Sequence, residues 1–195
     1  MKINSAVLFL FFLMPLFASF IPEQAQAQYE FGLSGGFRSG QATTDLAGAY
    51  ISAKAGYQLG AVTWLQIYQS WSLRTGFLYT QRPATLTNTK SGDVDIQFAY
   101  FDVPATASYK FSDYAGIFAG PVIAFNQSKD VSCSQRPDCA AIDVRGVLFP
   151  IELGLDFKFA PQLGGEVYFE YVPGNLSVNV AEMKTLGANL VFFFE

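Results

Sequence analysis

Two pairs of carboxylates are the residues whose types and spacing could support acid–base chemistry. Glu152 and Asp156 lie four residues apart, and so do Glu166 and Glu170. On an extended strand this spacing puts both members of a pair on one face, where they could act as paired acid and base. The sequence contains no histidine, which removes the usual general base and the commonest metal ligand. We therefore expect no enzyme activity, no cofactor and no metal site, and we interpret these acids as partners of nearby bases.

The acids occur in segments that alternate between apolar and polar residues. In the segment 148–159, the odd-numbered residues are all apolar, and the even-numbered residues include Glu152, Asp156 and Lys158. At helical spacing the apolar residues would scatter around the axis, so the alternation predicts a β-strand.

Eight segments show this pattern and predict eight strands. They are 29–38, 49–67, 71–82, 101–110, 114–126, 148–159, 166–171 and 185–194. Glycine and proline dilute both faces of 114–126, so the sides of that strand stay unassigned. The connections alternate between short turns and long loops, the loops being expected at 39–46, 83–93, 126–146 and 173–182. Such a rhythm is typical of an up-and-down meander with turns at one rim and loops at the other.

The beginning of the chain has a different composition. The sequence has 195 residues and is 51% hydrophobic, but its one continuous apolar run covers residues 6–21, after the positive Lys2. The segment Ala25-Gln26-Ala27 has the small-x-small form of a cleavage site, so we expect residues 1–27 to be a cleaved signal peptide and residues 28–195 to form one barrel domain. No later segment is long and apolar enough for a transmembrane helix. A net charge of −4 without a basic run argues against nucleic acid as a partner.

Alternation alone allows two barrels with opposite faces inward. A soluble, lipocalin-like barrel holds its apolar face inside, whereas a membrane barrel turns that face to lipid. Here the apolar face carries Tyr57, Trp71, Tyr79 and many Phe and Leu residues, which would overfill the narrow bore of an eight-stranded barrel. We therefore predict an all-β fold: an eight-stranded antiparallel up-and-down transmembrane β-barrel with short periplasmic turns and longer outer loops, integral to the cell outer membrane.

The polar face carries acids and bases in equal numbers. The acids are Glu30, Asp102, Glu152, Asp156, Glu166 and Glu170, and the bases are Arg38, Lys54, Arg74, Arg82, Lys110 and Lys158. An unpaired charge in a tight lumen is costly, so this balance predicts an ion-pair lattice that fills the bore and closes it to solutes. Function then falls on the outer loops. In the longest of them we expect a disulfide between Cys133 and Cys139, because export places both in an oxidising compartment.

Several short motifs give the chain a resemblance to a known family. They are Ser72-Leu73-Arg74-Thr75-Gly76-Phe77-Leu78-Tyr79, Tyr100-Phe101-Asp102-Val103-Pro104, Ala119-Gly120-Pro121 and the aromatic end of the last strand. With these the chain resembles the PorT-like outer-membrane β-barrel family of Bacteroidetes over nearly its whole mature length. That family usually has glutamate where Asp102 stands and an aromatic last residue where this chain has Glu195. The resemblance implies an outer-membrane barrel, and it does not carry over the secretion role of the member that names the family.

Three functional classes stay open at this stage. The first is a non-conducting barrel that serves as a structural anchor or adhesion protein and binds an unidentified protein or glycan at its outer loops. The second is a subunit or assembly factor of an envelope secretion machine, and the third is a soluble, lipocalin-like barrel that binds a ligand. For the membrane readings, the other expected partners are outer-membrane lipid and the barrel-assembly machinery.

Overall fold

β-Strands make up nearly all the regular structure that the computed structural model describes, in residues 29–44, 49–52, 54–88, 92–133, 144–176 and 180–194. The strands are β1 (Tyr29–Ala42), β2 (Ala49–Ser52), β3 (Lys54–Tyr68), β4 (Trp71–Asn88), β5 (Gly92–Ser112), β6 (Ala115–Cys133), β7 (Val147–Leu148), β8 (Ile151–Ala160), β9 (Leu163–Val172) and β10 (Met183–Phe194). No helix among these residues is long and apolar enough to cross a membrane.

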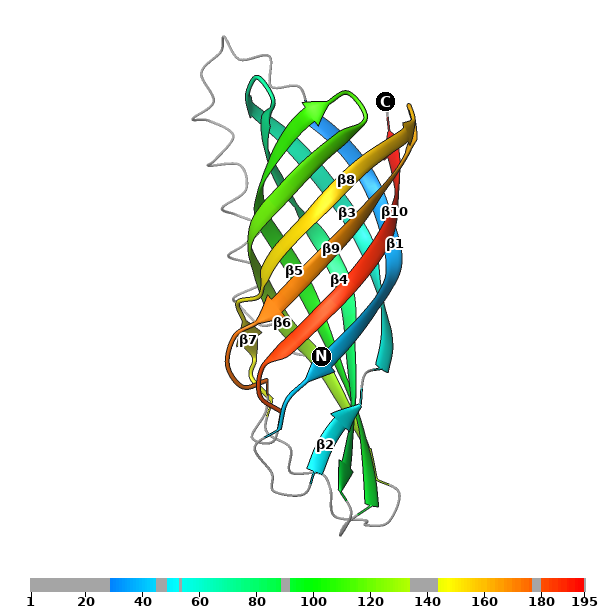
Figure 1. The fold of residues 1–195 in the computed structure, drawn as a ribbon, viewed down its shortest axis with the longest axis vertical. Coiled ribbons are helices and arrows are strands. Elements are labelled where there is room, and N and C mark those ends of the chain that lie inside the picture. Colours follow the sequence, from blue (N-terminus) through cyan, green and yellow to red (C-terminus); the bar gives the residue numbers. More distant parts are fainter. Residues whose placement is uncertain are drawn as a thin grey trace, which may run out of the picture.

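Eight of the strands close into a barrel. Each pairs antiparallel with its neighbours in the order β1, β3, β4, β5, β6, β8, β9 and β10, and β10 pairs with β1 again. The short strand β2 precedes β3 and pairs with β4, while β7 precedes β8 and pairs with β6. The predicted eight-stranded antiparallel barrel is confirmed (Figure 1).

The two rims of the barrel differ as predicted. Two-residue turns join β3 to β4, β5 to β6, and β8 to β9, and all three turns lie at the end where β10 finishes (Figure 1). At the opposite end, three of the four connections between strands are longer: those from β1 to β2, from β6 to β7 and from β9 to β10. In an outer-membrane barrel the short-turn rim is periplasmic and the rim with long connections faces outward.

The outer wall of the barrel is apolar and aromatic. Side chains such as Phe37, Leu59 and Leu190 are 77%, 62% and 62% exposed, and aromatic rings contact each other across strands. Tyr79 on β4 lies between Tyr57 and Phe101, with ring centroids 6.0 and 5.8 Å away. A surface of this kind matches the hydrocarbon of a bilayer. The soluble, lipocalin-like barrel is therefore the wrong reading, since it would need these faces inside.

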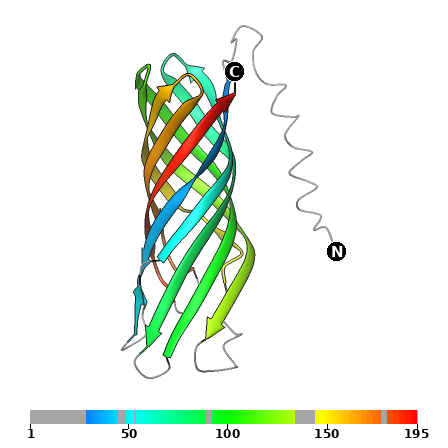
Figure 2. The ribbon, with the colours of Figure 1, turned by 90° about the vertical axis from the view of Figure 1, so that its right-hand side faces the viewer.

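Three expected loops are shorter than predicted because the strands continue through them. β4 runs to Asn88, β5 starts at Gly92, and β6 continues to Cys133, so most of the expected loop 83–93 is paired strand. β1 likewise continues to Ala42. The paired register extends past Thr85 and Asp95 into a part that projects beyond the outer rim (Figure 2). In this part the alternation has the opposite sense, because Ile96 and Phe98 are apolar and face inward whereas Asp95 and Gln97 are polar. The apolar outward face that predicts a membrane strand is therefore missing there.

The faces of β6, left open by the sequence, are assigned by the structure. Phe118, Val122 and Ala124 are buried inside the barrel, and Ile117 faces outward. Gly120 has a φ of 156°, and an added Cβ would lie 2.8 Å from both the carbonyl oxygen of Ala105 and the Cα of Thr106. Glycine is required there because β5 passes too close for any side chain. The predicted signal peptide, residues 1–27, lies outside the described residues.

Candidate functional site

Inward-facing side chains fill the lumen of the described structure in three layers. A network of charged and amide side chains occupies the middle, which we call the central network. Apolar side chains lie below and above it. Every strand of the barrel wall contributes at least one side chain to these layers or to their direct contacts.

Arg74 on β4 holds one half of the central network. Its guanidinium donates two parallel hydrogen bonds to Glu166 on β9, at 2.7 and 2.8 Å, and a longer one of 3.4 Å to Glu152 on β8. The guanidinium carbon also lies 4.5 Å from the centre of the Phe118 ring on β6. Such a two-pronged pair is the strongest geometry available to an arginine, and it joins opposite walls of the barrel.

Arg82, eight residues further along β4, holds the other half. It donates to both carboxylate oxygens of Asp102, at 3.0 and 2.8 Å, and to Glu170 at 2.8 Å. The guanidinium carbon lies 5.1 Å from the centre of the Tyr100 ring. Arg38 on β1 donates to Glu170 as well, so this carboxylate bridges two arginines on different strands.

Uncharged polar side chains extend the half that contains Arg74 and Glu166. Tyr168 donates its hydroxyl proton to the side-chain oxygen of Gln58 at 2.9 Å. Asn189 donates to the same oxygen at 3.3 Å and to Glu166 at 3.1 Å, while Gln58 donates to Thr80 at 3.1 Å. These residues carry no formal charge and are therefore absent from the predicted lattice. The alternation along each strand could have identified them, because each occupies the polar face of its strand.

Apolar clusters lie at both ends of the central network. At the periplasmic end an apolar plug consists of Val62, Trp64, Leu78, Val191 and Phe193, with the rings of Trp64 and Phe193 5.4 Å apart. At the outer end a larger outer cluster consists of Ile96, Phe98, Tyr100, Ala124, Leu148, Val172, Leu176, Val180 and Met183. Both clusters point inward, contrary to the simple expectation that all inward positions are polar.

The structure brings together seven of the twelve residues predicted for the lattice. They are Arg38, Arg74, Arg82, Asp102, Glu152, Glu166 and Glu170, all nearly fully buried. Three more form a separate cluster at the periplasmic mouth, where Glu30 lies 2.9 Å from Lys110 and 3.5 Å from Lys158. Asp156 lies between the two groups and has no ion pair among the described residues.

Lys54 lies apart from the rest, at the outer end of the wall. It pairs with Asp95 at 3.0 Å, and both side chains are partly exposed. Thr85 also donates a hydrogen bond to Asp95. These two contacts, the bond from Thr85 first, hold the pKa of Asp95 below its ordinary value. This trio fastens the base of the projecting strands rather than the bore.

The central network fixes strands of the barrel wall to one another across the bore. Its arginines and carboxylates are engaged with each other, and no cluster of three or more metal-binding side chains occurs among the described residues. Cys139 lies outside the described residues, and the side chain of Cys133 is not described either, so the predicted disulfide stays a prediction.

Comparison with known proteins agrees with this architecture. The model of a family described as "Outer membrane protein beta-barrel domain" matches residues 24–174. No curated protein is significantly similar in sequence.

Among the solved structures that resemble this one are the following three. Neisserial surface protein A is 14% identical with a TM-score of 0.56, over 84% of this chain and 97% of that one. OprG from Pseudomonas aeruginosa is 13% identical with a TM-score of 0.52, over 86% and 95%. Ail, the attachment invasion locus protein of Yersinia pestis, was solved with the heparin analogue sucrose octasulfate and is 17% identical with a TM-score of 0.50, over 86% and 99%. At these identities the likeness shows the fold alone.

The central network predicts a large difference between buried and exposed ion pairs. Replacing Arg74 by Met leaves Glu152 and Glu166 without their cation, and we expect a loss of about 3–5 kcal/mol in the free energy of unfolding, as for other broken buried pairs. The matched control is Lys54→Met, which breaks a half-exposed pair and should cost about 0–1 kcal/mol. Reversible guanidinium unfolding of both variants in lipid vesicles measures the two values. Equal losses would contradict the structural role of the network.

Proposed function

Because this chain belongs to the family of outer-membrane β-barrel domains, we propose that it is a closed anchor in the outer membrane that binds partners at its outward-facing surface. The observation that carries the proposal is the contrast between a bore filled along its length and strands that project beyond the outer rim. A bore with no room for solute leaves the ends of the barrel as the accessible chemistry.

Closure of the bore rests on three layers in series. They are the plug around Trp64 and Phe193, the arginine–carboxylate network and the outer cluster around Phe98 and Leu176. The first two interlock, since Leu78 of the plug lies between Arg74 and Arg82 on β4. Eight strands enclose a space that side chains can fill. A solute would have to displace apolar side chains twice and separate buried ion pairs once.

The projecting strands are suited to present a binding surface. They come from β2, β4, β5 and β6, and the outer cluster supports them from inside through Ile96 and Phe98. The contacts of Asp95 with Lys54 and Thr85 fasten their base. A surface held rigid in this way loses little conformational entropy when it binds a partner.

The comparisons support an adhesion reading over a catalytic one. Ail, which shares the fold, is named for attachment and was solved with a heparin analogue. The crosslinking experiment below tests whether the partner here is a protein or a glycan. We do not propose enzyme activity, since the sequence has no histidine and the buried carboxylates are paired with arginines.

A second candidate is a subunit or assembly factor of an envelope secretion machine, as a PorT-like member of the family. The finer family assignment is a proposal that rests on the segments 72–79, 100–104 and 119–121. Two of their residues have evident roles: Asp102 pairs with Arg82, and Gly120 lets β5 and β6 approach. A machine subunit would contact its neighbours through the barrel wall, and this separates the two candidates.

The filled bore predicts that the purified protein is electrically silent. In planar lipid bilayers we expect no steady conductance of porin size, because each of the three layers blocks ions. The control is the double variant Trp64→Ala with Phe193→Ala, which removes both aromatic rings of the plug and should stay silent since the central network and the outer cluster are left. Steady conductance of the unmodified protein would overturn the closed anchor and favour transport.

The location of partner contacts can be mapped in intact cells. A photo-reactive residue at Gln97, exposed on β5, should become covalently linked to a discrete partner on illumination. The matched site is Leu153, which is 50% exposed on the barrel wall and should link only to lipid. A discrete protein linked at Leu153 and none at Gln97 would replace the anchor proposal by the machine subunit.

The predicted disulfide can be tested without structural data. We expect Cys133 and Cys139 to be linked, so protein isolated from membranes without reductant should contain no thiol that reacts with a maleimide until it is reduced. The bridge closes a short loop, and in the entropic model replacing both residues by serine should cost about 2 kcal/mol or less. Two reactive thiols before reduction would refute the pairing.

A further inference from the structure

The charged part of the central network contains more acids than bases. It consists of four carboxylates and three guanidinium groups, each on a residue that is at most 4% exposed: Asp102, Glu152, Glu166, Glu170, Arg38, Arg74 and Arg82. If every group is ionised, one negative charge is left over. Among the described residues these carboxylates form ion pairs with the three arginines alone. A buried charge without compensation is strongly destabilising, so the network needs one further positive charge.

Lys54 is the base that the bore lacks. Six acids and six bases occupy the polar faces of the strands, but Lys54 pairs with Asp95 at 3.0 Å near the outer end of the wall. The side chains of this pair are 38% and 48% exposed, whereas the central network is buried. Six acids and five bases therefore stay in the bore.

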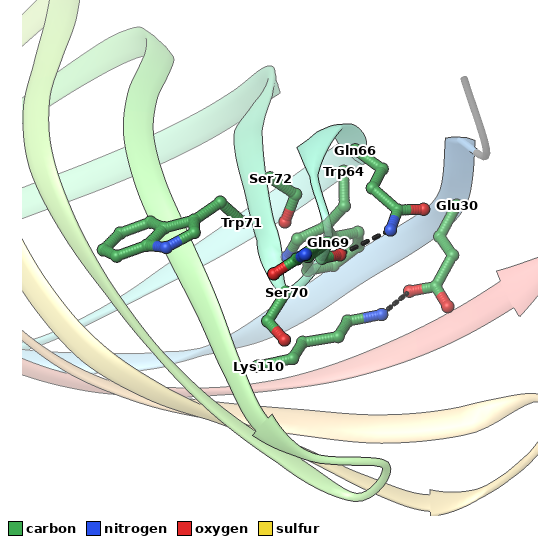
Figure 3. A pocket seen from close by; sticks show the side chains of 8 residues that line it. All are labelled: Glu30, Trp64, Gln66, Gln69, Ser70, Trp71, Ser72 and Lys110. Carbon is green, nitrogen blue, oxygen red and sulfur yellow. Dashed lines mark hydrogen bonds and ion pairs between the residues drawn. The ribbon is translucent and has the colours of Figure 1, made fainter. Parts of the chain in front are cut away.

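The bases at the periplasmic mouth compensate a different acid. Lys110 and Lys158 share the carboxylate of Glu30, at 2.9 and 3.5 Å, and Figure 3 shows Glu30 and Lys110 joined. These three groups carry one excess positive charge. Asp156 lines the same small recess as all three, so its negative charge is attracted to them without direct contact. The mouth together with Asp156 is therefore neutral, and the deficit stays in the central network.

Glu152 on β8 has the weakest contact with a cation in the network. Its only ion pair among the described residues is one of 3.4 Å with Arg74, which directs two shorter bonds to Glu166. The other carboxylates are better supplied, since Asp102 accepts two bonds from one arginine and Glu170 accepts bonds from two. Hydrogen bonds to the ionised form stabilise a carboxylate, and Glu152 receives the fewest.

Glu152 also faces another acid across the sheet. It stands directly opposite Glu170 on β9, and like charges in such a cross-strand pair are destabilising. On its other side it stands opposite Gly120 on β6, which has no side chain. The charged groups that act on it are Arg74 on β4, Arg38 on β1 and the two acids of β9, and both arginines are bonded to those acids. Where two carboxyl groups share a site, one of them commonly holds a proton.

We propose that Glu152 holds a proton in the folded barrel and that this proton is the missing positive charge of the central network. The neutral carboxyl group keeps an oxygen that accepts from Arg74, and it does not repel Glu170. The proton thus allows β8 and β9 to stand side by side with acids at opposite positions. This proposal concerns the inside of the barrel and does not rest on binding at the outer surface.

Infrared spectroscopy detects such a proton directly. The carbonyl stretch of a protonated carboxyl group is separate from the bands of carboxylates and amides, and exposed acids are ionised at neutral pH. We therefore expect a protonated-carboxyl band from the full-length protein in lipid vesicles at neutral pH. Glu152→Gln should abolish this band. Asp156→Asn is the matched control and should leave it, although Asp156 also stands opposite an acid, Glu166.

Two kinds of result would overturn the proposal. Absence of the band from the unmodified protein would show that a bound cation, and not a proton, balances the network. A band that survives Glu152→Gln, or one that disappears with Asp156→Asn, would assign the proton to another acid.

Unfolding in guanidinium gives a second, independent measurement. Glutamine has the shape of a protonated glutamate without a charge, so Glu152→Gln should leave the unfolding midpoint unchanged or raise it. Glu166→Gln changes a similarly buried acid, 1% against 4% exposed, but weakens the two-pronged pair with Arg74 and should lower the midpoint. A similar decrease in both variants would show that both acids are ionised and would contradict the proposal.

Discussion

Compensation of charge inside a narrow bore is the constraint on which the rest of this structure depends. A barrel whose outer wall faces lipid can place charged side chains only inward, and there each needs a partner within reach. Arg74 meets Glu166 across 92 positions of sequence, and Arg38 meets Glu170 across 132. Such pairs join strands that are not neighbours in the sheet, so they fix the cross-section of the barrel as well as its charge. The strands position the charged side chains, and the ion pairs between those side chains in turn hold the strands together.

Much of this arrangement could be predicted from one strand at a time. Period-two alternation identifies the faces of a membrane strand, so residues such as Glu166 and Glu170 are assigned to the bore from the sequence alone. Which acid meets which base could not be predicted, because that depends on the stagger between strands on opposite walls. Lys54 illustrates the limit. It has the right parity for the bore but stands near the outer end of its strand, where Asp95 of the projecting part pairs with it.

The apolar ends of the lumen show a second limit. Trp64 shares the parity of Gln58 on β3, so the sequence places it inward, yet a rule that treats inward as polar does not anticipate it. The bore has no single chemistry along its length. The fully buried charges lie in the middle, and apolar side chains separate them from both ends. Beyond the apolar plug, the half-exposed Glu30, Lys110 and Lys158 form their own cluster at the periplasmic mouth. The projecting strands reverse the alternation, since their outward faces do not meet lipid and apolar residues such as Ile96 and Phe98 face inward.

A bore filled along its length also separates the two surfaces of the protein. No solute can pass from the periplasmic rim to the outer strands, because the plug at Trp64 and Phe193 and the pairs of Arg74 and Arg82 lie between them. Any influence of one end on the other must travel through the strands themselves. The central network opposes this too, since moving a strand would separate buried pairs that cost several kcal/mol to break. A barrel built in this way presents two independent surfaces on opposite sides of one membrane. Its buried ion pairs keep the strands that carry both surfaces rigid.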